Sequence, residues 1–215
     1  MTQCIVGANC FAVNVKSSGA QSRSDRTMYS PRRIAQMAAF FAKKEGEVIP
    51  VLKLTKLLYL ADRESLARYG APITYDRPVS MDHGPVLTRA LNLIDGNVNG
   101  AAAAQWDEWM GPRRGYDVRV KRQFSREDLD ELSDADLEVL ETVWHQFGHM
   151  DKWTLRDWTH KNCAEWRDPD GSSVPIDEVE RLRAVGVQPE QARVLADEIC
   201  AQRELDRYFA QAARM

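Results

Sequence analysis

Residues 50–70 read PVLKLTKLLYLADRESLARYG, with a proline at the start and a glycine at the end as boundary signals of a helix. Apolar residues recur at helical spacing along one side: Val51, Leu54, Leu58 and Ala61. Leu57 and Leu60 add a second apolar side. A helix that is apolar on two sides is usually buried on both, so we predict the central helix of the domain here. The alternative is that Leu57, Tyr59 and Leu60 meet a partner protein.

Further helices are predicted on both sides of this stretch. Their start signals are Ser30-Pro31, Gly84-Pro85, Ser133, Thr154, Pro175 and Pro189. Ser133 and Asp136 form a pair of the capping-box type. No internal repeat is visible. The chain therefore reads as a succession of helices.

One segment has the alternating pattern of a strand. Tyr116, Val118 and Val120 alternate with charged residues, and the segment around Trp106 is a candidate pairing partner. The stretch GNVNGAAAA at 96–104 is predicted as a loop. We therefore expect a mainly α fold, a compact multi-helix domain with a short strand or hairpin near residues 113–124.

Composition excludes several classes of protein. The 215 residues are 44% hydrophobic and 28% charged, with a formal net charge of −3. This balance suits an ordinary globular core and argues against disorder, a strongly basic nucleic-acid binder and a membrane-spanning protein. Four cysteines are too few for a disulfide scaffold, which favours reduced thiols in the cytoplasm. We expect no secretory signal.

Catalytic and metal-binding motifs are weak. His145 and His149 are four residues apart, but Gly148 is expected to end their helix first. His160 and Cys163 offer a second pair, for a metal or for a nucleophile and its base. The chain has no G-x-S-x-G, no P-loop and no G-x-G-x-x-G. We therefore predict no enzyme, no metal and no cofactor.

A basic cluster supports an alternative function. Its residues are Arg113, Arg114, Arg119, Lys121 and Arg122. Such a cluster can grip phosphates, as in a nucleic-acid-binding regulator of its own operon. The chain is acidic overall and aromatic residues are sparse in this cluster. A solvated strand edge or a docking site for an acidic partner is therefore favoured.

Four of the six tryptophans fall close together in the sequence, at Trp144, Trp153, Trp158 and Trp166. Tryptophan is common both in cores and at the energetic centres of protein interfaces. Core positions are the default interpretation. The alternative is that several of them border a groove for another protein.

The order of motifs resembles the Panacea domain, the family of SocA-like antitoxins that also includes phage-associated GepA-like proteins. Residues 53–59 (KLTKLLY) match the K-L-x-K-L-L-Y helix of the family, and residues 76–86 (DRPVSMDHGPV) resemble its D-R-x-x-x-M-x-H-G-P-V stretch. The segments after Leu132 and around Asp157 resemble two later elements of the family. Trp158 and Glu165 depart from the pattern, because the family usually has Leu and Pro there.

The resemblance covers roughly residues 28–185. It leaves a leader at 1–27, which we expect to be flexible, outside the domain, with Met28 as an alternative start. A helical extension at 186–215 also lies outside it. Because terminal extensions often decide partner choice, this extension leaves the identity of the partner open.

The resemblance implies an antitoxin that neutralises a protein toxin encoded beside it by direct contact. In one branch, the family member also hands the toxin to a bacterial AAA+ protease. Such contact needs an interface of about 1,600 Å² or more. The partner-binding residues that follow from the matching motifs are Lys53, Lys56, Tyr59, His83, Arg89, His160 and Trp166. The alternative for His83 and His160 is a hydrogen-bonding role at helix starts. The possibility of a homo-oligomer stays open.

Overall fold

The computed structural model describes residues 28–212. They form eight helices and five short strands, which confirms the mainly α prediction. The helices are α1 (Pro31–Glu45), α2 (Val51–Tyr69), α3 (Thr88–Asp95), α4 (Gly100–Asp107), α5 (Asp134–Phe147), α6 (Lys152–Asn162), α7 (Glu178–Ala184) and α8 (Pro189–Ala212). The expectation of a flexible leader at 1–27 concerns residues outside this range.

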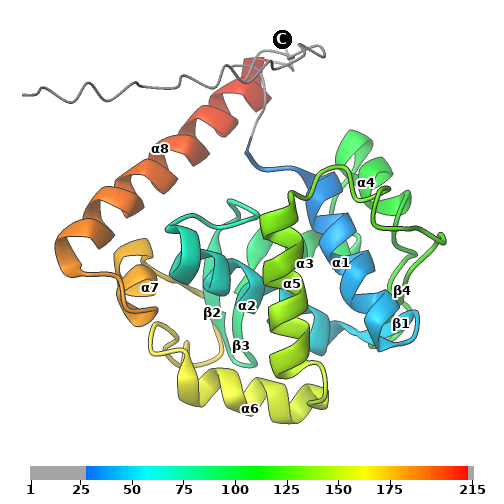
Figure 1. The fold of residues 1–215 in the computed structure, drawn as a ribbon, viewed down its shortest axis with the longest axis horizontal. Coiled ribbons are helices and arrows are strands. Elements are labelled where there is room, and N and C mark those ends of the chain that lie inside the picture. Colours follow the sequence, from blue (N-terminus) through cyan, green and yellow to red (C-terminus); the bar gives the residue numbers. More distant parts are fainter. Residues whose placement is uncertain (1–27, 213–215) are drawn as a thin grey trace, which may run out of the picture.

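Helix α2 lies at the centre, as its two-sided apolar pattern predicts. It packs against α1, α5 and α6 and against strand β3 (Gly84–Leu87). Leu57, Leu58 and Tyr59 have no exposed surface, so both sides of the helix are buried. Figure 1 shows α8 beside α7 at one side of the molecule, while α1 and α4 lie at the other.

Local signals set several helix boundaries. Ser30 Oγ accepts a hydrogen bond from the backbone of Arg33, and Pro31 occupies the first turn of α1. Ser133 and Asp136 form the predicted capping box at the start of α5. Helix α6 starts at the cap residue Asp151, not at Thr154, because the Asp151 carboxylate accepts from the backbone of Trp153 and Thr154.

The strand prediction is confirmed at β4 (Asp117–Arg119). Its partner is β1 (Val48–Pro50), the connection that precedes α2, with Ile49 opposite Val118. Only a single bridge joins Val120 to Met110, near the segment around Trp106. The loop prediction at 96–104 is wrong from residue 100 onward, because four consecutive alanines favour the helix α4.

A second sheet has the order β3–β2–β5, with β2 at Pro78–Met81 and β5 at Val174–Pro175. Strands β2 and β3 form an antiparallel hairpin. The prediction of a helix start at Gly84-Pro85 is therefore wrong, and the helix begins at Thr88. The proline is tolerated because it lies in an edge strand of this small sheet.

The C-terminal helices have a small apolar cluster of their own. It joins Leu66 of α2 to Leu182 of α7 and to Ala192, Ala196 and Ile199 of α8. The predicted boundary at residue 186 falls between α7 and α8, whose side chains share this cluster. At the other end of α8, the Asp206 carboxylate accepts from the backbone N–H groups of Met28 and Tyr29. Helix α8 is therefore tied to the rest of the chain at both ends.

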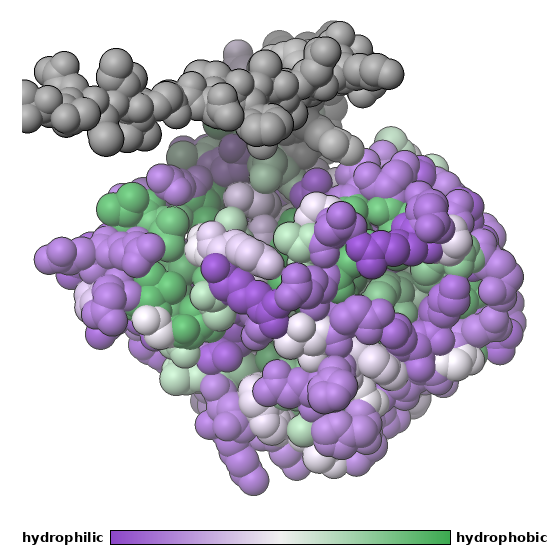
Figure 2. All heavy atoms as spheres, viewed as in Figure 1, coloured by the Kyte–Doolittle hydropathy of each residue, from purple (hydrophilic) through white to green (hydrophobic). Residues whose placement is uncertain are grey.

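The surface is mostly hydrophilic on the face drawn in Figure 2, with smaller hydrophobic areas toward its left and right sides. The exposed large apolar residues of α8 are Val194, Leu205, Tyr208 and Phe209. None of the helices in residues 28–212 is long and apolar enough to cross a membrane.

Candidate functional site

The hairpin of β2 and β3 forms one wall of the candidate site. Asp82 and His83 make its two-residue turn, and Gly84 follows with a φ of +92°. A Cβ atom at this position would lie 2.8 Å from Thr159 Oγ1 and 3.1 Å from the His160 ring. Glycine is required here both for the backbone conformation and for the close approach of α6. The H-G-P motif therefore marks a packing contact.

Three hydrogen bonds hold the hairpin against the helices. Lys56 Nζ donates to the backbone carbonyl of Pro85 at 2.9 Å, and Trp166 Nε1 donates to that of Met81 at 3.1 Å. The backbone N–H of Arg167 donates to Ser80 Oγ at 3.2 Å. These bonds tie α2 and the segment after α6 to opposite strands of the hairpin.

Asp76 explains the start of α3 beside the hairpin. Its buried carboxylate accepts from the backbone of Arg77, Arg89 and Ala90, at 2.6, 3.0 and 2.8 Å. It thus caps α3, although it lies twelve residues before the helix. Burial raises the pKa of Asp76 to about 6, against the lowering effect of these three donors. The aspartate of the family motif therefore has a structural role here.

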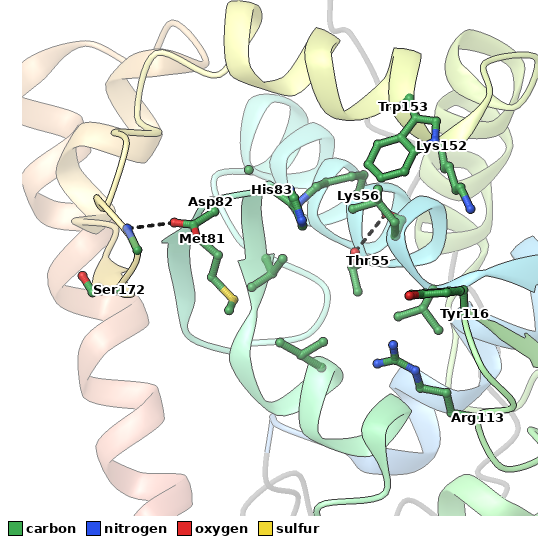
Figure 3. A pocket seen from close by; sticks show the side chains of 16 residues that line it. Thr55, Lys56, Met81, Asp82, His83, Arg113, Tyr116, Lys152, Trp153 and Ser172 are labelled. Carbon is green, nitrogen blue, oxygen red and sulfur yellow. Dashed lines mark hydrogen bonds between the residues drawn. The ribbon is translucent and has the colours of Figure 1, made fainter.

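A cavity of about 690 Å³ opens in front of this hairpin, and we call it the hairpin groove. It is bounded by the start of α2, the hairpin turn, α3, the loop before β4, the start of α6 and residues 171–172. Figure 3 shows the labelled residues arranged around it, with Lys152 and Trp153 from α6, Arg113 and Tyr116 from the loop, and Met81 and Asp82 from the hairpin.

Exposed aromatic residues border the hairpin groove. Tyr116 is 76% exposed and Trp153 is 49% exposed. The Lys152 ammonium lies 5.8 Å and 5.5 Å from their ring centroids, and the His83 ring meets Trp153 edge to face at 6.2 Å. Exposed tryptophan and tyrosine beside cations are typical of the energetic centre of a protein interface. Trp153 thus borders a groove and departs from the default interpretation as a core residue. That another protein binds there stays a prediction.

The predicted partner-binding residues divide into buried and accessible ones. Lys53, Lys56 and Tyr59 are buried in α2. Lys53 Nζ contacts Glu45 at 2.5 Å, and the Tyr59 hydroxyl donates to Glu165 at 2.6 Å. Any role of Lys53 and Tyr59 in partner binding is therefore indirect, through the shape of the surface above them. Lys56 is part of the lining of the hairpin groove although its surface is buried.

Glu165, which departs from the expected family pattern, is a buried carboxylate. Besides the Tyr59 hydroxyl, it accepts from Arg63 Nε at 2.9 Å. Burial raises the pKa of Tyr59 well above its usual value, so the hydroxyl keeps its proton as the donor. Arg181 of α7 lies over the same ring, at 5.2 Å from its centroid. Nothing in the sequence marked Arg181, which is fully buried.

The accessible candidates lie at different places. His83 is exposed and lines the hairpin groove. His160 and Trp166 stack on each other at 4.0 Å behind Gly84, and Arg89 lies on α3 over the ring of Tyr29 at 4.1 Å. Within residues 28–212, the side chains of His83 and His160 make no hydrogen bond, so neither locks a helix start. That a partner contacts His83, Arg89, His160 or Trp166 stays a prediction.

The basic cluster is split by the fold. Arg113 borders the hairpin groove and pairs with Asp95, while Arg122 pairs with Glu108 at 3.1 Å. Arg114, Arg119 and Lys121 are exposed around a second hollow of about 650 Å³ beside β4. The five residues therefore form no single patch, and two of them have carboxylate partners.

Burial shifts the pKa of both members of the His160 and Cys163 pair. Burial raises the pKa of Cys163 to about 12, so its thiol is protonated near neutral pH. Burial also lowers the pKa of His160. No group of three metal-ligating side chains comes together in the described part of the chain. Cys4 and Cys10 lie outside that part.

The exposed aromatic residues around the hairpin groove are of the types that dominate binding energy at protein interfaces. Residues 54–167 match the family described as antitoxin SocA-like, Panacea domain. Because the match spans more than half of the chain, this protein belongs to that family. The matched span includes α2 from Leu54 onward, the hairpin and Trp153. No curated protein and no solved structure matches the chain.

Proposed function

We propose that this protein is a cytoplasmic antitoxin that neutralises a protein toxin by direct contact, and that the hairpin groove is the centre of that contact. The observation that supports this most is that the family span of 54–167 contains most of the groove. Its mouth presents Trp153 and Tyr116, the residue types that dominate binding energy when they become buried. The proposal assigns no catalytic step.

The test is neutralisation in living cells. The gene beside this one is induced alone and together with this protein, and growth is measured. We expect arrest in the first case and growth in the second. The variant Tyr116→Ala with Trp153→Ala is expected to lose protection, while the matched exposed change Tyr208→Ala on α8 keeps it. Equal protection by the native protein, the double variant and Tyr208→Ala would show that the groove is not the site of contact.

Delivery of the toxin to an AAA+ protease is a second step of the same proposal. It predicts that the toxin half-life in cells shortens when this protein is present, and that deletion of the protease restores the half-life. A nucleic-acid-binding role is less favoured, because the fold distributes the basic cluster over separate places, with Arg113 at the hairpin groove and three others around the second hollow.

A further inference from the structure

The floor of the hairpin groove is apolar. Its side chains come from α2, β3 and α3, and they are Val51, Leu52, Val86 and Leu91. Aliphatic side chains offer no hydrogen bonds to a sugar or to the edge of a base, but they gain free energy when they are covered by another apolar side chain. A volume of about 690 Å³ accommodates several such side chains.

The rim of the hairpin groove is positively charged. Lys152 has no carboxylate within ion-pair distance among residues 28–212, and its ammonium lies over two aromatic rings. Arg113 stands across from it with a single carboxylate partner, Asp95. The one acidic residue of the lining, Asp82, already accepts a hydrogen bond from the backbone of Gly171 at 3.1 Å. The rim therefore has a cation without a counter-charge next to an apolar floor.

We propose that the hairpin groove takes an acidic, apolar segment of the toxin, with apolar side chains on the floor and carboxylates beside Lys152 and Arg113. This inference rests on the proposed function, because the occupant is a part of the toxin. The aromatic rings of Tyr116 and Trp153 cover the segment and shield these ion pairs from water, which strengthens them. The charge complementarity sets both the rate of association and the choice of partner.

The test uses fluorescein-labelled peptides with blocked ends and fluorescence anisotropy. The acidic probe is LEFLDL, the neutral control is LQFLNL and the basic control is LKFLKL. We expect the acidic peptide to bind about five-fold or more tightly than the neutral one, and the difference to shrink at high salt. The double variant Arg113→Glu with Lys152→Glu is expected to reverse this order and to favour the basic peptide.

A matched control keeps the net charge of that variant. Arg119→Glu with Lys161→Glu reverses two exposed residues that do not line the hairpin groove, and it is expected to keep the preference for LEFLDL. Circular dichroism confirms the fold of each variant. The inference is overturned if no peptide binds, if LEFLDL binds no more tightly than LQFLNL, or if the two double variants behave alike. A twelve-nucleotide single strand that outcompetes LEFLDL at the same residues also overturns it, in favour of nucleic acid.

The peptide assay tests the chemistry of the groove and the growth assay tests the antitoxin function, so either can fail while the other succeeds. If this protein protects cells from the toxin while LEFLDL shows no preference, the antitoxin function stands and the groove chemistry is wrong. If LEFLDL binds as expected while the adjacent gene product is not neutralised, the groove chemistry stands and the antitoxin function is wrong.

Discussion

Lys56 carries the sharpest stability prediction. It has no exposed surface, and its ammonium has one hydrogen bond, to Pro85, and no carboxylate partner among the described residues. Burial lowers its pKa to about 7, whereas an unfolded chain gives lysine a pKa of about 10.4. Between these values the unfolded state binds more protons than the native state, so stability rises with pH. From pH 7 to pH 8.5, this group adds about 2 kcal/mol to the free energy of unfolding.

Lys56→Met removes this effect, because methionine fills similar space without a charge. Urea unfolding is measured by circular dichroism at several values from pH 7 to pH 8.5 for the native protein, for Lys56→Met and for the exposed control Lys121→Met. We expect the native protein and the control to gain stability in parallel, and the difference between them and Lys56→Met to change by about 2 kcal/mol over this range. Parallel curves for all three proteins would refute the reasoning.

Two further changes test the packing around this lysine by urea unfolding. Gly84→Ala should destabilise the fold by about 1 kcal/mol through its positive φ and by about 1–3 kcal/mol more through the clash with Thr159. The control Gly46→Ala has a φ of +99° and nothing within 4 Å, so it should show only the first of these costs. Equal losses would contradict the clash. Tyr59→Phe should cost about 1–2 kcal/mol, because Glu165 loses a buried donor, and a loss within error of zero would show that Arg63 alone satisfies that carboxylate.

The sequence predicted the helices well where apolar periodicity and boundary signals agree. Helix α2 was found because its two apolar sides and its proline and glycine boundaries agree, and α5 because of its capping box. The strand at β4 was predicted from alternation, but its pairing with β1 was not. Pairing depends on contacts between residues about seventy positions apart, which local patterns do not contain.

The hairpin and the hairpin groove could not be predicted from local sequence patterns. Gly84-Pro85 is a common helix start signal. Only the folded structure shows that Gly84 begins a strand and that α6 packs closely against it. The family motif drew attention to Lys56 and Tyr59, although both are interior residues. Lys152 and Tyr116 were missed, because their importance comes from segments that meet only in the folded chain. The one sequence feature that pointed to this groove was the density of tryptophans around Trp153.

The most direct test of the account is the affinity of this purified protein for the purified product of the adjacent gene, measured by isothermal titration calorimetry. The account predicts a one-to-one complex that is weakened about 100-fold or more when Trp153→Ala and Tyr116→Ala are combined, because both side chains lie at the mouth of the hairpin groove. The variant is expected to stay as stable as the native protein in urea. No complex at micromolar concentrations would contradict the antitoxin function, and a complex of unchanged affinity in the variant would contradict its placement at the groove.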